Sequence, residues 1–119
     1  MNVILVLDEE QELRDGIASL LVTDGYRVIT ARDDEEAILR TRVEQPDLIL
    51  AGVSGSESDA IANTRHTREC ISRQNTPIVI FSARTIIEGE EKEIPDRIYL
   101  VRPEEFNQVR SLLRKILVE

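Results

Sequence analysis

Side chains that can bind ions or form ion pairs follow directly after several short apolar runs of the sequence. Asp8 and Glu9 come after the first run, a serine follows a later one, and an arginine follows the last. Carboxylates carry negative charge, and a guanidinium can form two parallel hydrogen bonds with a carboxylate. The residues at or just beyond these run ends, in chain order, are Asp8, Glu9, Gly52, Ser54, Ser82 and Arg102.

Other kinds of site find little support in the sequence. His66 is the one histidine and Cys70 the one cysteine, so there is no zinc-ligand cluster, internal disulfide or evident Cys/His pair. We interpret both as ordinary helix residues. The loops carry no glycine-rich phosphate-binding sequence, and no acid–base dyad with a nucleophile is visible. We therefore expect no enzyme, and a small α/β enzyme or flavin binder is kept as an alternative.

The charge balance limits the range of partners. The 119 residues include 15 Lys and Arg against 23 Asp and Glu, so the formal net charge is −8. Nucleic acids and anionic lipids are bound by clustered cations, so direct binding to either is not expected. No apolar run approaches the roughly 20 residues of a membrane span, and no signal-peptide pattern opens the chain. We expect a single domain over residues 1–119, located in the cytoplasm.

The apolar runs predict five short strands. Each run is apolar on successive residues rather than on alternate ones, which is typical of strands buried on both faces in a parallel sheet. The predicted strands span residues 3–7, 27–31, 48–51, 78–81 and 98–101.

Helical patterns lie between these strands. Leu13, Ile17, Leu20 and Leu21 have the spacing of one buried helix face, and Gly25 is expected in a left-handed conformation just after that helix. Acidic residues at 33–36 predict the start of a second helix that runs to about residue 44 before a proline. A third helix is expected over residues 59–71, and residues 84–95 are predicted to form at most a short helix. The last helix, entered at residue 103, should turn these residues inward: Phe106, Val109, Leu112, Leu113, Ile116 and Leu117.

Alternating strands and helices define the fold class. Buried strands joined by helices form a parallel sheet with helices on both faces, and right-handed crossovers leave few topologies at this size. We predict a flavodoxin-like, doubly wound α/β domain with five parallel strands in the order 2-1-3-4-5. Ligands of such sheets bind beyond the carboxyl ends of the strands, where the candidate side chains stand.

Five segments resemble the receiver domain of two-component response regulators, and together they cover essentially the whole chain. The segments are Ile4-Leu5-Val6-Leu7-Asp8-Glu9-Glu10, Asp24-Gly25-Tyr26-Arg27-Val28, Pro46-Asp47-Leu48-Ile49-Leu50, Pro77-Ile78-Val79-Ile80-Phe81-Ser82-Ala83 and Tyr99-Leu100-Val101-Arg102-Pro103.

The resemblance assigns roles to single residues. It places the phospho-accepting aspartate of the family at Gly52, the switch hydroxyl at Ser82, and a switch aromatic at Tyr99. It implies a Mg²⁺ site at Asp8, Glu9 and Ser54, and it places the family's lysine at Arg102.

Departures from the family pattern change the functional expectation. Glycine at position 52 cannot form an acyl phosphate, and the missing carboxylate argues against a tight Mg²⁺ site. The sequence therefore predicts a pseudo-receiver, a signalling module that is independent of phosphorylation. Arg102 is expected to pair with Asp8 or Glu9 in place of a metal.

The resemblance also implies protein partners, such as a sensor kinase or an output domain. A homodimer through residues 84–94, 98–101 and 104–118 is a further expectation. Two functional alternatives stay open beside the small enzyme or flavin binder. One is a working phosphorelay receiver with an unusual acceptor at Asp8, Glu9 or Ser54, and the other is the regulatory domain of a longer transcription factor or enzyme.

Overall fold

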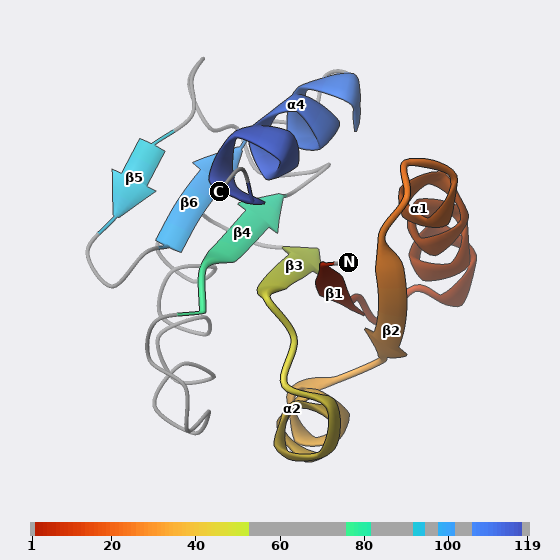
Figure 1. Ribbon diagram of the computed structural model, residues 1–119. Helices are drawn as coiled ribbons and strands as arrows, with labels where there is room; N and C mark the ends of the chain where they lie inside the picture. The colour runs from red at the N-terminus through yellow and green to blue at the C-terminus, as the bar shows by residue number, and fades with distance from the viewer. Residues whose placement is uncertain (1, 53–75, 82–91, 95–97, 102–105, 118–119) are drawn as a thin grey trace.

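The computed structural model describes residues 2–52, 76–81, 92–94, 98–101 and 106–117 of the chain. They form six strands and three helices around one sheet (Figure 1). The elements are β1 (Val3–Leu7), α1 (Gln11–Thr23), β2 (Arg27–Ala31), α2 (Asp34–Glu44), β3 (Leu48–Gly52), β4 (Ile78–Phe81), β5 (Lys92–Ile94), β6 (Ile98–Val101) and α4 (Phe106–Leu117).

The sheet has the predicted order. Its strands run β2-β1-β3-β4-β6-β5, and the first five of these pair in parallel. Strand β6 is therefore the fifth strand expected from the sequence, and the doubly wound order 2-1-3-4-5 is confirmed. The edge strand β5 was not among the five predicted strands. It pairs antiparallel with β6. The prediction of at most a short helix at residues 84–95 is wrong for residues 92–94, and the rest of that stretch lies outside the described residues.

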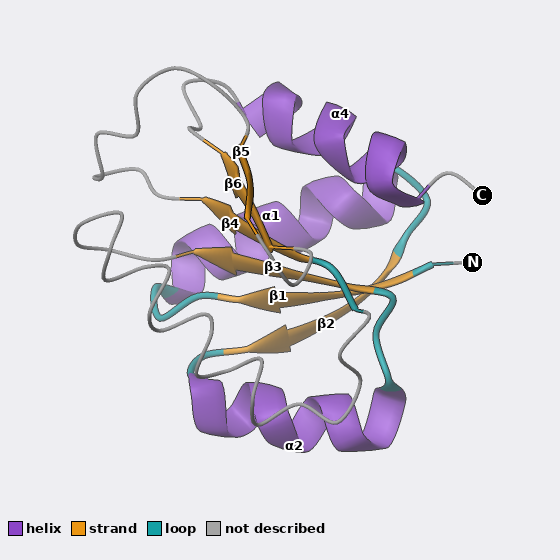
Figure 2. Ribbon diagram, turned by 90° about the vertical axis from the view of Figure 1, so that its left-hand side faces the viewer, coloured by secondary structure: helices purple, strands orange, loops and turns teal. Residues whose placement is uncertain are grey.

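Two apolar cores cover the two faces of the sheet. Side chains of a strand alternate between faces, so Leu5 and Leu7 pack with Ala37 of α2, whereas Ile4 and Val6 pack with residues of α1 and α4. Figure 2 shows α1 and α4 on one face and α2 on the other. Helices on both faces are thus confirmed.

Helix α1 buries a narrower stripe than the sequence predicts. Ile17 and Leu21 are buried, but Leu13 is 38% exposed and Leu20 is 41% exposed. Spacing alone places all four on one side of the helix, but the face that meets the sheet is turned towards Ile17 and Leu21, so Leu13 and Leu20 lie at its margin. The expectation that Leu13 and Leu20 are core residues is therefore wrong.

The ends of α1 and α2 follow from local backbone chemistry. Gly25 has φ +97°, its N–H donates to the carbonyl of Val22, and the N–H of Tyr26 donates to that of Leu21. This pair of bonds is the Schellman motif, which satisfies the last carbonyls of α1. Asp33 is the N-cap of helix α2, and its Oδ1 accepts the N–H of Glu36 at 2.8 Å.

Helix α4 buries the predicted stripe where its side chains are described. Val109, Leu112 and Leu113 are buried, and Ile116 and Leu117 pack partly buried against the same core. The side chain of Phe106, residue 103 and the predicted third helix lie outside the described residues. None of the helices in the described part of the chain has the length and apolar character needed to span a bilayer.

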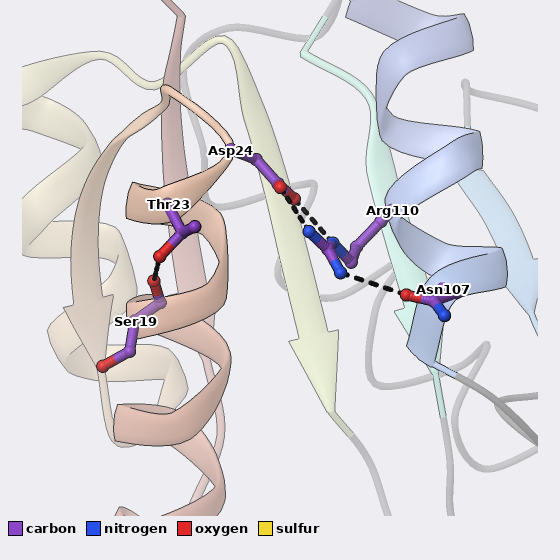
Figure 3. Close-up of polar contacts among 5 residues, drawn as sticks. All are labelled: Ser19, Thr23, Asp24, Asn107 and Arg110. Atoms are coloured by element: carbon purple, nitrogen blue, oxygen red, sulfur yellow. Dashed lines mark hydrogen bonds and ion pairs between the residues drawn. The ribbon is translucent and has the colours of Figure 1, made fainter.

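An ion pair joins α4 to the corner between α1 and β2. Arg110 donates from Nε to Oδ2 of Asp24 at 2.7 Å and from Nη2 to Oδ1, and its Nη1 donates to Asn107 at 3.0 Å (Figure 3). The Asp24 side chain is 8% exposed. The hydrogen bond from Arg110 is the main reason that the pKa of Asp24 lies below its ordinary value.

Alanine substitutions at Gly16 in α1 and at Gly25 in the turn that follows it should have opposite effects on stability. Gly25→Ala should lower the free energy of unfolding by about 1–2 kcal/mol, because a Cβ is strained at this positive φ. Gly16→Ala should raise it by about 0.5–1 kcal/mol, because a Cβ there meets no atom within 4 Å and alanine favours a helix interior. Urea denaturation of both variants measures the two changes, and equal effects would contradict the assigned backbone conformations.

The Asp24–Arg110 pair should make stability depend on acid pH. The lowered pKa of Asp24 means that the pair stabilises the fold above the ordinary carboxyl pKa near 3.8, and that this contribution is lost as the pH falls through the folded-state value. Asp24→Asn should therefore lower the free energy of unfolding at pH 7, with a deficit that shrinks in acid. Denaturation from pH 7 to pH 2 tests this, and a deficit that stays constant with pH would contradict the assignment.

Candidate functional site

The strand register brings Asp8 and Gly52, two of the candidate residues, to one edge of the sheet. Leu7 pairs with Ala51, and Gly52 pairs with Phe81, which in turn pairs with Val101. Strands β1, β2 and β3 end on the same side of the molecule (Figure 2). Asp8, the first residue after β1, is therefore next in register to Gly52, at the point where the strand order reverses.

Asp8 is held in a buried position by backbone bonds. It is 8% exposed, and its N–H donates to the carbonyl of Ala31 at 3.1 Å. Its Oδ1 accepts the N–H of Glu10 at 2.9 Å. Glu9, the second acid of the predicted pair, is exposed. The two carboxylates are adjacent in sequence but lie in different environments.

Burial dominates the electrostatics of Asp8. Loss of water raises the pKa of its carboxyl above the ordinary value, and the negative charges of Glu10 and Glu9 act in the same direction. The N–H of Glu10 and the positive charge of Arg14 act against this change. The net effect is that ionisation of Asp8 is less favourable in the folded protein than in water.

Arg14 is a residue of this edge that the sequence patterns did not single out. Its Nη1 donates to the backbone carbonyl oxygen of Asp8 at 2.7 Å. It lies on the first turns of α1, six residues after Asp8, where the helix starts back along the sheet. The signal available in the sequence was a cation one turn into the helix that follows an acidic strand end.

The described residues do not fit a Mg²⁺ site of the implied kind. Gly52 has no side-chain oxygen, and Oδ1 of Asp8 is already used as an acceptor. In residues 2–52 and the other described segments, no three His, Cys, Asp or Glu side chains gather closely enough to hold a metal ion. We therefore derive no chemical step through a metal.

The remaining predicted site residues are only partly described. Ser54, Ser82 and Arg102 lie outside the described residues, so the proposed pairing of Arg102 with Asp8 or Glu9 stays a prediction. Tyr99 lies in β6, where its backbone pairs with Val79 of β4 and Glu93 of β5.

Comparison with solved structures decides the fold assignment. The response regulator TrrA from Thermotoga maritima, solved with Mg²⁺ and BeF, aligns with a TM-score of 0.74 at 21% identity, over 98% of this chain and 100% of that one. The same regulator in complex with the histidine kinase ThkA aligns with a TM-score of 0.75 at 20% identity, over 99% of this chain and 100% of that one. The chain has a receiver fold.

Curated relatives of this receiver-fold chain are regulators. It is 30% identical to the alkaline phosphatase synthesis transcriptional regulatory protein PhoP of Bacillus subtilis, over 96% of the chain and 48% of that protein. It is 32% identical to a probable transcriptional regulator, ycf27, of Cyanophora paradoxa, over 94% of the chain and 48% of that protein. The chain thus spans about half the length of these relatives. No protein-family model matches it. The proteins to which it is similar are response regulators and their receiver domains.

Neutralising Asp8 should stabilise this receiver-fold domain above acid pH. A raised pKa in the folded state means that the charged carboxyl destabilises the fold as the pH rises from the ordinary value of 3.8 through the folded-state value. Asp8→Asn keeps an oxygen that can accept the N–H of Glu10 and removes the charge. We expect a higher free energy of unfolding than wild type at pH 7, and a gain that disappears below about pH 3.5.

Glu9→Gln is the matched control, because Glu9 is the exposed neighbour. It should change the free energy of unfolding at pH 7 by no more than about 0.5 kcal/mol. Thermal and urea unfolding at several pH values measure both variants. A loss of stability in Asp8→Asn at pH 7 would show that the charge of Asp8 is needed by the fold.

Proposed function

We propose that this receiver-fold domain is a signalling module that works through protein–protein contacts and forms no acyl phosphate at position 52. The observation that carries the proposal is Gly52 at the carboxyl end of β3, beside Asp8 in the register. An aspartyl phosphate requires a side-chain carboxylate as nucleophile, and glycine has none.

Neighbouring side chains at this edge do not replace the missing nucleophile well. Ala51 precedes Gly52, is buried, and carries only a methyl group. Asp8 is buried, and one of its oxygens already accepts a backbone N–H, so its carboxyl group is poorly accessible to a phosphodonor. Glu9 is exposed, but it follows β1 rather than β3, the strand that ends at position 52. These properties favour an edge that is not chemically modified.

Protein partners suit the domain better than nucleic acid. The net charge of −8 opposes contact with a phosphate backbone. The similar regulator TrrA has been solved in complex with a histidine kinase, which supports a sensor kinase as one class of partner for this fold. The relatives named as transcriptional regulators are about twice as long as this chain, which favours an output domain as another class.

Incubation with a small phosphodonor tests the proposal directly. The wild-type chain, mixed with acetyl phosphate and Mg²⁺, should show no added phosphoryl mass by intact-protein mass spectrometry. A receiver domain that keeps its acceptor aspartate, treated in parallel, confirms that the donor is active. Phosphoryl mass on the wild-type chain would contradict the proposal, and peptide mapping would then show whether Asp8, Glu9 or Ser54 is the unusual acceptor.

Gly52→Asp tests whether the missing carboxylate alone accounts for the expected lack of phosphorylation. The new carboxylate would join those of Asp8 and Glu9 at the same edge, so we expect this variant to gain phosphoryl mass under identical conditions. A variant that gains none would show that Glu9, Arg102 or the following loop has also altered the pocket.

A further inference from the structure

Helix α2 has apolar side chains on two opposite faces. Ala37 and Thr41 are buried against the sheet. Leu39 and Val43 point the other way, and they are 56% and 81% exposed. They are four residues apart, so they lie next to each other on the outer surface of the helix.

These two residues are not needed to attach α2 to the sheet. The inner face of α2 contributes Ala37 to the core formed with β1, β2, β3 and β4. Surface helices normally place polar residues on the face opposite the core. Single exposed apolar residues are common, but an adjacent pair at the centre of the outer face favours a contact surface.

Charged residues flank this pair in a definite order. At 100° per residue, Glu36 and Arg40 lie on one side of Leu39 and Val43, and Glu35 and Arg42 lie on the other side. On both sides the acid precedes the base along the helix. Two such helices placed antiparallel would therefore bring acids opposite bases on both sides of the apolar pair.

We propose that the outer face of α2 binds a second copy of this chain, with the two α2 helices antiparallel and a two-fold axis near Ile38. In this register Glu36 faces the partner's Arg40, and Glu35 faces the partner's Arg42. The pairs occur twice by symmetry, as in any isologous interface. Val43 of each copy packs over the first turns of the other helix.

The charge order selects a second copy over an unrelated partner. A partner with its own sequence would need a matching acid and base on each side of an apolar pair, whereas a copy supplies both by symmetry. Within the chain, Glu36 pairs with Arg32 at 3.7 Å and Arg40 with Glu44 at 3.9 Å. The first pair is solvent-exposed, and in the second Arg40 is exposed and Glu44 also pairs with Arg27, so contacts across the interface can replace both.

This surface is distinct from the dimer face expected from the family resemblance. Helix α2 lies on the opposite side of the sheet from α4, as Figure 2 shows. A contact made by one short helix from each copy falls at the small end of the interface range. The dimer should therefore depend on protein concentration.

Sedimentation equilibrium of two valine variants tests the surface. The wild-type chain, of 13.5 kDa, should shift towards the dimer mass as its concentration rises. Val43→Glu should weaken dimerisation by about tenfold or more, because the new carboxylate would face the acidic first turn of the partner helix. Val22→Glu is the matched control, since Val22 is 58% exposed on α1 and receives the same change in charge. It should dimerise like wild type.

Exchange of one charge pair provides a second test that loss of folding cannot imitate. Glu36→Arg and Arg40→Glu should each dimerise poorly alone, because like charges then face each other. An equimolar mixture of the two variants should restore dimers, because each chain then meets the opposite charge at both positions.

Four results would overturn the proposal. The first is a wild-type chain that stays monomeric at all concentrations, and the second is dimerisation unchanged in Val43→Glu. The third is equal weakening by Val22→Glu, and the fourth is an equimolar mixture that does not associate.

Discussion

Burial of the central strands on both faces is the constraint on which the rest of this domain depends. Ile4, Leu5 and Val6 of β1 are all fully buried, although successive side chains point to opposite sides of the sheet. Helices must therefore cover both faces, and the chain must cross over between parallel strands. The same constraint brings the carboxyl ends of β1 and β3 together. A chemically important edge is thus a geometric consequence of how the core is buried.

The composition of that edge departs from the family pattern that the sequence resembles. A buried Asp8, a glycine at the end of β3 and an arginine bonded to the carbonyl of Asp8 make a corner with less negative charge than a cluster of carboxylates would have. The described residues of this corner therefore offer few oxygen ligands for a divalent cation. The proposed function, protein contacts without an acyl phosphate at position 52, rests on this composition.

The two faces of the sheet differ in the contacts that attach their helices. On one face, α4 is tied to the end of α1 by the Asp24–Arg110 pair as well as by apolar packing. On the other face, α2 buries only Ala37 and Thr41 against the sheet. Its outer surface carries exposed apolar and charged side chains. A signalling domain that acts through contacts needs surfaces that the fold itself does not use. The outer face of α2 meets that requirement.

Local patterns in the sequence determined the five parallel strands and the left-handed Gly25, because continuous apolar runs and backbone preferences act over a few residues. The order of these strands followed from the general rules for crossovers between parallel strands. Tertiary structure alone decided the rest. Leu13 and Leu20 share a helix face with core residues but lie at its margin, strand β5 exists only by pairing with β6, and Arg110 reaches Asp24 across 86 residues of chain. Periodicity tells which residues can share a face. Which of them are buried, and which distant groups meet, depends on how the packed elements fit together.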